Sequence, residues 1–102
     1  MRPALLIRPE AADDIQTARD WYERQRSGLG SEFLACLDDR LSLIQASPQS
    51  YARVYGRVRR CKLRRFPYLV FYREFENRVE VLAEFHASRN PVLWRSRVRG
   101  EA

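Results

Sequence analysis

Apolar residues recur at helical spacing in the first half of the chain and alternate with polar ones in the second half. The apolar run Ala4–Ile7 predicts a short strand. Apolar residues spaced by four, three and four then predict an amphipathic helix over residues 9–25, with Pro9 in its first turn. A second apolar stripe predicts a helix over residues 31–47. Because the loop between the two helices is short, they should form an antiparallel hairpin.

The second half of the chain predicts strands. Residues 49–57 are expected to form a connecting loop. Charged and apolar side chains alternate over Val58–Arg65, which indicates a strand. Tyr68–Phe75 is almost entirely aromatic or branched, which favours a central strand buried on both faces. Residues 79–86 alternate again and predict the last strand.

This order of elements predicts an α+β fold. A helical hairpin should pack on one face of a small, mainly antiparallel sheet, and the other face should carry arginines. The 102 residues are expected to form a single domain, because one hydrophobic core serves a chain of this length. Residues 91–102 are predicted to be a basic C-terminal tail that Trp94 packs back onto the sheet.

Composition excludes several classes of protein. A hydrophobic content of 45% is enough for a core without disulfides. Two cysteines and one histidine are too few for a structural zinc site, so no metal and no other cofactor is expected. The N-terminal apolar run is too short for a secretory signal or a membrane span, which predicts a cytoplasmic protein that does not bind a membrane.

The charge is unevenly distributed along the chain. The net charge is +6, and all but one of the 19 basic residues are arginines. Residues 53–73 contain eight basic side chains and no acidic one. Such a block attracts a polyanion, either a nucleic acid or an acidic protein. The alternative interpretation is a solvated strand face that only keeps the protein soluble.

Four segments, in this order and spacing, resemble the RelE/ParE superfamily of type II toxin–antitoxin toxins, which includes the plasmid stabilisation proteins. The resemblance covers nearly the whole chain. The four segments are Arg8–Ile15; Phe33 with Leu37, Leu41, Ile44 and then Pro48; Lys62–Tyr68 running into Val70–Arg73; and Val79–Ala83 followed by Phe85–Pro91 and Trp94.

The resemblance implies a bacterial toxin in a hetero-oligomer with a small acidic antitoxin, whose C-terminal segment wraps the toxin. It also implies one of two activities. RelE-like members cleave mRNA on the ribosome with basic and acid–base side chains, whereas ParE-like members inhibit DNA gyrase without known catalytic chemistry. The fold alone does not choose between them.

A ribonuclease needs a base, an acid and cations around the scissile phosphate. Arg64, Arg65 and Arg73 are candidates for the cations, and His86, with Arg89 nearby, is the candidate acid or base. By strand parity, Glu80 and Glu84 should share the face of His86 and offer carboxylates to it. The alternative role of His86 is structural, in a hydrogen bond with Ser88 or Asn90.

Basic and aromatic side chains are the candidates for contact with a partner, and no metal ligand is among them. The predicted contacts are Arg57, Arg59, Lys62, Arg64, Trp21, Trp94, Arg95 and Arg97.

Two departures from the RelE-like pattern favour a ParE-like toxin. Lys62 is the sole lysine, where RelE-like enzymes often carry a cluster of them, and no tyrosine follows Tyr72. A ParE-like binder of a target such as gyrase is therefore the leading hypothesis. A RelE-like mRNA endonuclease is the first alternative, and a non-toxic superfamily member that only binds a protein partner is the second.

Overall fold

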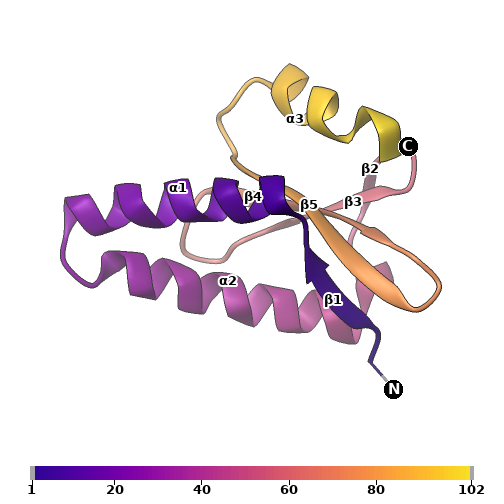
Figure 1. Ribbon diagram of the computed structural model, residues 1–102, viewed down its shortest axis with the longest axis horizontal. Helices are drawn as coiled ribbons and strands as arrows, with labels where there is room; N and C mark the ends of the chain where they lie inside the picture. The colour runs from indigo at the N-terminus through magenta and orange to yellow at the C-terminus, as the bar shows by residue number, and fades with distance from the viewer. Residues whose placement is uncertain (1, 102) are drawn as a thin grey trace.

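A computed structural model describes residues 2–101 of the chain (Figure 1). Along the chain the elements are β1 (Ala4–Ile7), α1 (Pro9–Gln25), α2 (Leu29–Ala46), a 3-10 turn (Pro48–Ser50), β2 (Arg53–Tyr55), β3 (Val58–Lys62), β4 (Tyr68–Glu74), β5 (Arg78–His86), α3 (Pro91–Val98) and a second 3-10 turn (Arg99–Glu101). None of the helices within these residues is long and apolar enough to cross a membrane.

The five strands form one mixed sheet in the order β1-β5-β4-β3-β2. β1 runs parallel to β5, and the other neighbouring pairs are antiparallel. β1 ends at Ile7 opposite Val81, so the last part of β5 extends beyond it. The predicted α+β fold, with its helical hairpin and mainly antiparallel sheet, is confirmed.

The hairpin of α1 and α2 covers one face of the sheet and forms the larger core. Phe33 and Ile44 from α2 pack with Val70 and Tyr72 from β4, all of them fully buried. The buried Tyr72 hydroxyl donates to the Pro48 carbonyl at 2.6 Å, and burial raises its pKa. Aromatic rings fill the end of the core nearest the α1–α2 loop: Tyr22, Phe33, Phe66 and Tyr68.

α3 covers part of the opposite face of the sheet. This face also carries Arg73 opposite Val58 and Arg60 opposite Phe71, as the sequence predicted. Trp94 of α3 stacks on Phe71 of β4 with ring centroids 4.7 Å apart, and Val98 is fully buried beside them. Asn90 starts the helix, because its side chain accepts the Val92 N–H at 3.0 Å. The predicted basic tail is therefore an ordered helix, and Trp94 does pack back onto the sheet.

Several element boundaries differ from the prediction, and one short strand was not predicted. α2 begins at Leu29 rather than 31, directly after Gly28, whose φ of 90° suits glycine. β2 lies inside the predicted loop over 49–57, and it is only three residues long. β3 ends at Lys62 instead of Arg65, because the chain turns before Tyr68.

An irregularity in β5 reverses one prediction about its faces. Phe71 pairs with Ala83 while its neighbour Tyr72 pairs with Val81, so Leu82 is an extra residue in the strand. Glu84 lies opposite Val70 on the hairpin face, whereas Glu80 lies opposite Arg73 on the α3 side. Strict alternation had predicted that Glu80 and Glu84 share a face. Because of the extra residue, they lie on opposite faces of the sheet.

Candidate functional site

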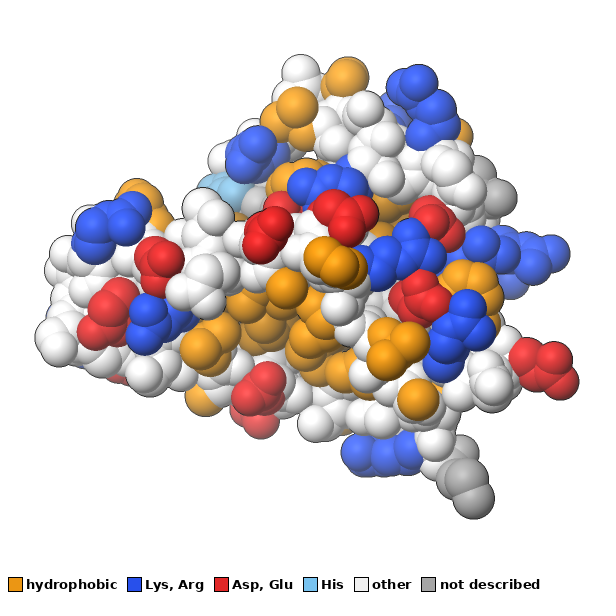
Figure 2. Space-filling model, viewed as in Figure 1, with side chains coloured by type: hydrophobic (Ala, Val, Ile, Leu, Met, Phe, Trp, Pro, Cys, Tyr) orange, Lys and Arg blue, Asp and Glu red, His pale blue; other side chains and the backbone are white. Residues whose placement is uncertain are grey.

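The end of β5, α1 and α3 together enclose an open cleft of about 240 Å³. In Figure 2 the pale blue histidine surface lies in the notch between the helical hairpin and the C-terminal segment. The cleft contains two of the predicted catalytic candidates, His86 and Arg89, together with acidic groups from α1 and β5. Its lining residues are Asp13, Asp14, Thr17, Ala18, Tyr68, Glu84, Phe85, His86, Arg89 and Arg97.

His86 is anchored to the turn that follows it. Its Nδ1 accepts the Ser88 N–H at 3.0 Å and lies 2.7 Å from the Ser88 Oγ. A nitrogen that accepts a backbone N–H carries no proton, so the neutral ring holds its proton on Nε2. The ring also meets Tyr68 edge to face, with centroids 5.2 Å apart. These contacts match the structural role that the sequence offered as an alternative.

Asp14 links α1 to both β5 and α3. Its carboxylate accepts the Glu84 N–H at 3.0 Å, in the part of β5 beyond the end of β1. The same carboxylate pairs with both terminal nitrogens of Arg97, at 2.9 and 3.1 Å. Asp14 therefore caps the open edge of β5, and Arg97 neutralises it.

Glu84 lies in the cleft with His86, as strand parity predicted, but it is deeply buried. The residue is 2% exposed, and neither carboxyl oxygen has a hydrogen-bond partner among the described residues. Burial, and to a smaller extent the nearby Asp14 charge, raises the pKa of Glu84 to about 8. Glu84 is therefore largely protonated at neutral pH. The sequence signal for it is a glutamate between the apolar residues Ala83 and Phe85.

The other three catalytic candidates do not line the cleft that contains His86. Arg65 binds Glu32 of α2 at 2.9 Å, and Arg64 lines a groove beside α2 with Cys36 and Asp39. The pKa of Glu32 is lowered by its hydrogen bond from Arg65 and then by that from Arg26.

Arg73 lies near the other end of β4. Its guanidinium pairs with Glu101 at 3.4 Å and lies over the Phe75 ring. Tyr68 pairs with His86, so Arg73 is five positions further along the strand, or about 17 Å. The structure thus brings His86 and Arg89 together and separates them from Arg73.

An ion-pair network near Arg73 has no counterpart in the sequence analysis. The Glu80 carboxylate binds Arg78 at 2.5 Å and Arg8 at 2.7 Å, and its pKa is lowered by the Arg78 hydrogen bond and then by Arg8. Arg8 also pairs with Glu101 from the C-terminal turn. These contacts join the start of α1, β5 and the C-terminal end, so the network is structural.

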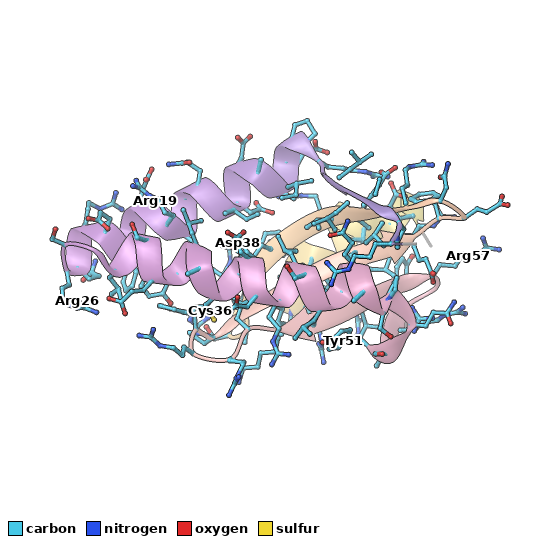
Figure 3. All side chains as sticks on the ribbon, turned by 90° about the horizontal axis from the view of Figure 1, so that it is seen from below. Arg19, Arg26, Cys36, Asp38, Tyr51 and Arg57 are labelled. Carbon is cyan, nitrogen blue, oxygen red and sulfur yellow. The ribbon has the colours of Figure 1, made fainter. Side chains whose placement is uncertain are left out.

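The predicted partner contacts divide into exposed and buried groups. Arg57 lies at the β2–β3 turn, at the opposite end of the molecule from Arg26 (Figure 3). Trp21 is 49% exposed, whereas Trp94 is 6% exposed and belongs to the second core. Arg59 is held by the Tyr51 carbonyl at 2.6 Å. The groups left free to meet a partner are Arg57, Lys62, Arg64, Arg95 and Trp21.

Solved structures place this fold in a known class. The chain is similar to a chain of the chromosomal ParDE TA system from P. aeruginosa, with a TM-score of 0.76 and 16% identity over 85% of this chain and 98% of that one. It is also similar to the isolated E. coli RelE toxin, with a TM-score of 0.64 and 20% identity over 95% and 97% of the two chains. The chain is similar as well to a double mutant of the E. coli RelE toxin in the free state. That alignment covers 100% of each chain, with 17% identity and a TM-score of 0.66. The architecture is therefore that of the RelE/ParE toxins.

The sequence itself defines the family more narrowly. Residues 5–91 match the model of the "ParE toxin of type II toxin-antitoxin system, parDE". The chain therefore belongs to the ParE toxin family. No curated protein sequence matches it.

Proposed function

We propose that this protein is the toxin of a ParDE-type pair, which arrests growth by binding a cellular target such as DNA gyrase and is neutralised by a cognate antitoxin. The family match supports the toxin and its antitoxin partner. The mode of action, binding without RNA chemistry, rests on the arrangement of the candidate residues.

The separation of those residues is the observation that carries the proposal. Stabilising the charge of a scissile phosphate requires cations within hydrogen-bond distance of the same oxygen atoms. Arg73 is about 17 Å along the sheet from His86. Arg65 is engaged by Glu32, and the Nδ1 of His86 is engaged by Ser88. This arrangement favours the interpretation that these residues belong to a binding surface, and it argues against a set of cooperating catalytic groups.

The exposed basic side chains are the part of the surface that a target or an antitoxin would use. Arg57, Lys62, Arg64 and Arg95 are all exposed. On the face shown in Figure 2, basic side chains lie at several separate places among acidic ones rather than in one continuous patch. Such a pattern suits a partner that follows the surface over a long path, as an extended acidic segment does.

Controlled expression tests the proposal. Induction of the wild-type protein in a bacterial host is expected to arrest growth, and co-expression of its cognate antitoxin is expected to restore it. Unimpaired growth at a confirmed level of folded protein would contradict the toxin assignment. It would favour a family member that only binds a protein partner.

A further inference from the structure

The Glu84 side chain lines the cleft with hydrogen-bonding capacity that no described residue uses. It is almost completely buried, and both Oε1 and Oε2 lack a partner within residues 2–101. An ionised carboxylate accepts about four hydrogen bonds. Native proteins seldom bury such a group without a partner unless it has a function or a ligand.

Neither arginine that lines the cleft donates a hydrogen bond to Glu84 in the described part of the chain. Arg97 uses both terminal nitrogens on Asp14, and the guanidinium of Arg89 lies 5.3 Å from the centre of the Phe85 ring. Asp14 therefore has its counter-ion, whereas Glu84 beside it has none. The Glu84 carboxyl is therefore the buried acidic group of the cleft that lacks a partner among the described residues.

A second hollow continues from this cleft along α1. It has a volume of about 380 Å³ and is lined by Trp21, Tyr22, Pro67, Tyr68 and His86. Tyr68 and His86 line both hollows, so the two form one path with an acidic end and an aromatic end. Planar cations stack on aromatic faces and bind carboxylates at their edge, and arginine does both at once.

We propose that this path is a binding site for one arginine side chain of the antitoxin, whose guanidinium pairs with Glu84 while its stem lies along the aromatic hollow. Guanidinium presents two parallel N–H donors, which match the two oxygens of a carboxylate, whereas the ammonium of lysine is a single point of charge. The inference rests on the proposed function, because it takes the antitoxin as the partner.

Charge complementarity selects this occupant. The chain carries a net charge of +6, so a partner that follows its surface is mainly acidic. The cleft contains the carboxyl groups of Asp13, Asp14 and Glu84 and the two guanidinium groups of Arg89 and Arg97, so ionised Glu84 leaves one negative charge to be matched. A single arginine in an acidic segment would therefore fit here and be repelled by most of the rest of the surface. It would fix the register in which the segment binds.

The protonation of Glu84 couples this site to pH. Burial and Asp14 raise its pKa to about 8 in the free protein, so an arriving guanidinium must displace a proton. Affinity is expected to rise by up to about tenfold per pH unit as pH increases towards 8. The other titratable or charged groups that line the two hollows are Asp13, Asp14 and Tyr22 from α1, Tyr68 from β4, His86 from β5, Arg89 from the following turn and Arg97 from α3.

Affinity measurements on the purified toxin and antitoxin test the site. Glu84→Gln keeps the shape of the side chain and removes its charge, and it is expected to weaken antitoxin binding by roughly 10- to 100-fold. It should also abolish the rise in affinity between about pH 6 and 8. Asp38→Asn removes the same charge from an exposed position on α2 and is the matched control, with unchanged affinity expected.

A double-mutant cycle identifies the occupant. Each basic residue of the antitoxin segment is replaced by alanine and combined with Glu84→Gln, and one arginine is expected to lose its effect in the Glu84→Gln background. As a direct probe, methylguanidinium should lower the pKa of the Glu84 carboxyl in carbon-13 NMR titrations of the free toxin. Tetramethylammonium at the same concentration should leave it unchanged.

Several outcomes would overturn the inference. Tight antitoxin binding that Glu84→Gln leaves unchanged would refute the site and leave the proposed function standing. Absence of any antitoxin binding by the folded wild-type toxin would refute both. Coupling to a lysine, or self-association of the toxin that depends on Glu84, would show that the occupant is a different group or a second copy of the chain.

Discussion

Asp14 and Arg97, which are 83 positions apart in the chain, form a two-point ion pair that joins α1 to α3. Asp14 also accepts the N–H of Glu84, so helix, strand and C-terminal helix meet at one carboxylate. The side chains of Asp14 and Arg97 are 13% and 27% exposed. Partial burial strengthens the pair relative to an ion pair on the open surface.

Arg97→Ala is expected to lower the free energy of unfolding by about 1–3 kcal/mol, because it leaves the Asp14 carboxylate unpaired beside Glu84. Arg95→Ala, an exposed arginine on the same helix, should change it by less than about 0.5 kcal/mol. Urea denaturation of the two variants checks this. Equal losses of unfolding free energy in the two variants would show that the ion pair between Arg97 and Asp14 does not stabilise the fold.

Trp94→Ala is expected to destabilise the fold by about 3–5 kcal/mol, because the ring is buried in the second core and stacks on Phe71. Leu93→Ala, at a neighbouring position that is 43% exposed, should have a much smaller effect. Thermal or urea unfolding measures both. A Trp94→Ala protein as stable as wild type would mean that α3 contributes little to the core.

Glu84→Gln is expected to make the protein more stable at alkaline pH. Folding raises the pKa of Glu84 from 4.5 to about 8, so the folded chain holds a proton that the unfolded chain has released. Stability from this group therefore falls as pH rises between about 4.5 and 8. The glutamine variant should lack this fall and exceed wild type by a few kcal/mol near pH 9. Parallel pH–stability curves that never diverge would contradict the buried state of Glu84.

Arg95→Glu is expected to reduce toxicity while leaving the fold intact, because Arg95 is exposed on α3 and offers its charge to a target. Arg97→Glu provides the contrast, since it places a third acidic group beside Asp14 and Glu84 and should unfold the protein. Growth after induction is measured alongside the level of folded protein. Undiminished toxicity of a folded Arg95→Glu variant would remove α3 from the target surface.

Much of the fold follows from the sequence because hydrophobic spacing determines which face of each element is buried. The helix over 9–25 was predicted from that spacing, and the strands at Ala4–Ile7 and Tyr68–Phe75 were predicted from their continuous apolar composition. The bulge at Leu82 was not predicted, because an extra residue in a strand leaves no mark in the sequence pattern. After the bulge, each side chain lies on the opposite face of the sheet from the one that regular alternation would give it. Glu80 and Glu84 were assigned to a single face for this reason.

The short strand β2 was missed because three residues carry almost no periodicity. The packing of Trp94 onto the sheet was predicted. The burial of Val98 in the same core was not, because the apolar residues of α3 are few and become core only by docking on Phe71. Among the candidate site residues, the sequence placed His86 near Arg89 through their spacing. The distance to Arg73 depends on how β4 and β5 are paired, which no local pattern contains.

Side-by-side assays of gyrase supercoiling and ribosome-bound mRNA cleavage, with the folded wild-type protein and its His86→Ala variant, distinguish target binding from RNA cleavage. We predict that the wild type inhibits supercoiling, leaves mRNA intact, and keeps its toxicity when His86 is replaced by alanine in a folded protein. Codon-phased mRNA cuts by the wild type that fall by about 10²–10⁴-fold in His86→Ala would contradict it. They would assign the protein to RNA cleavage instead.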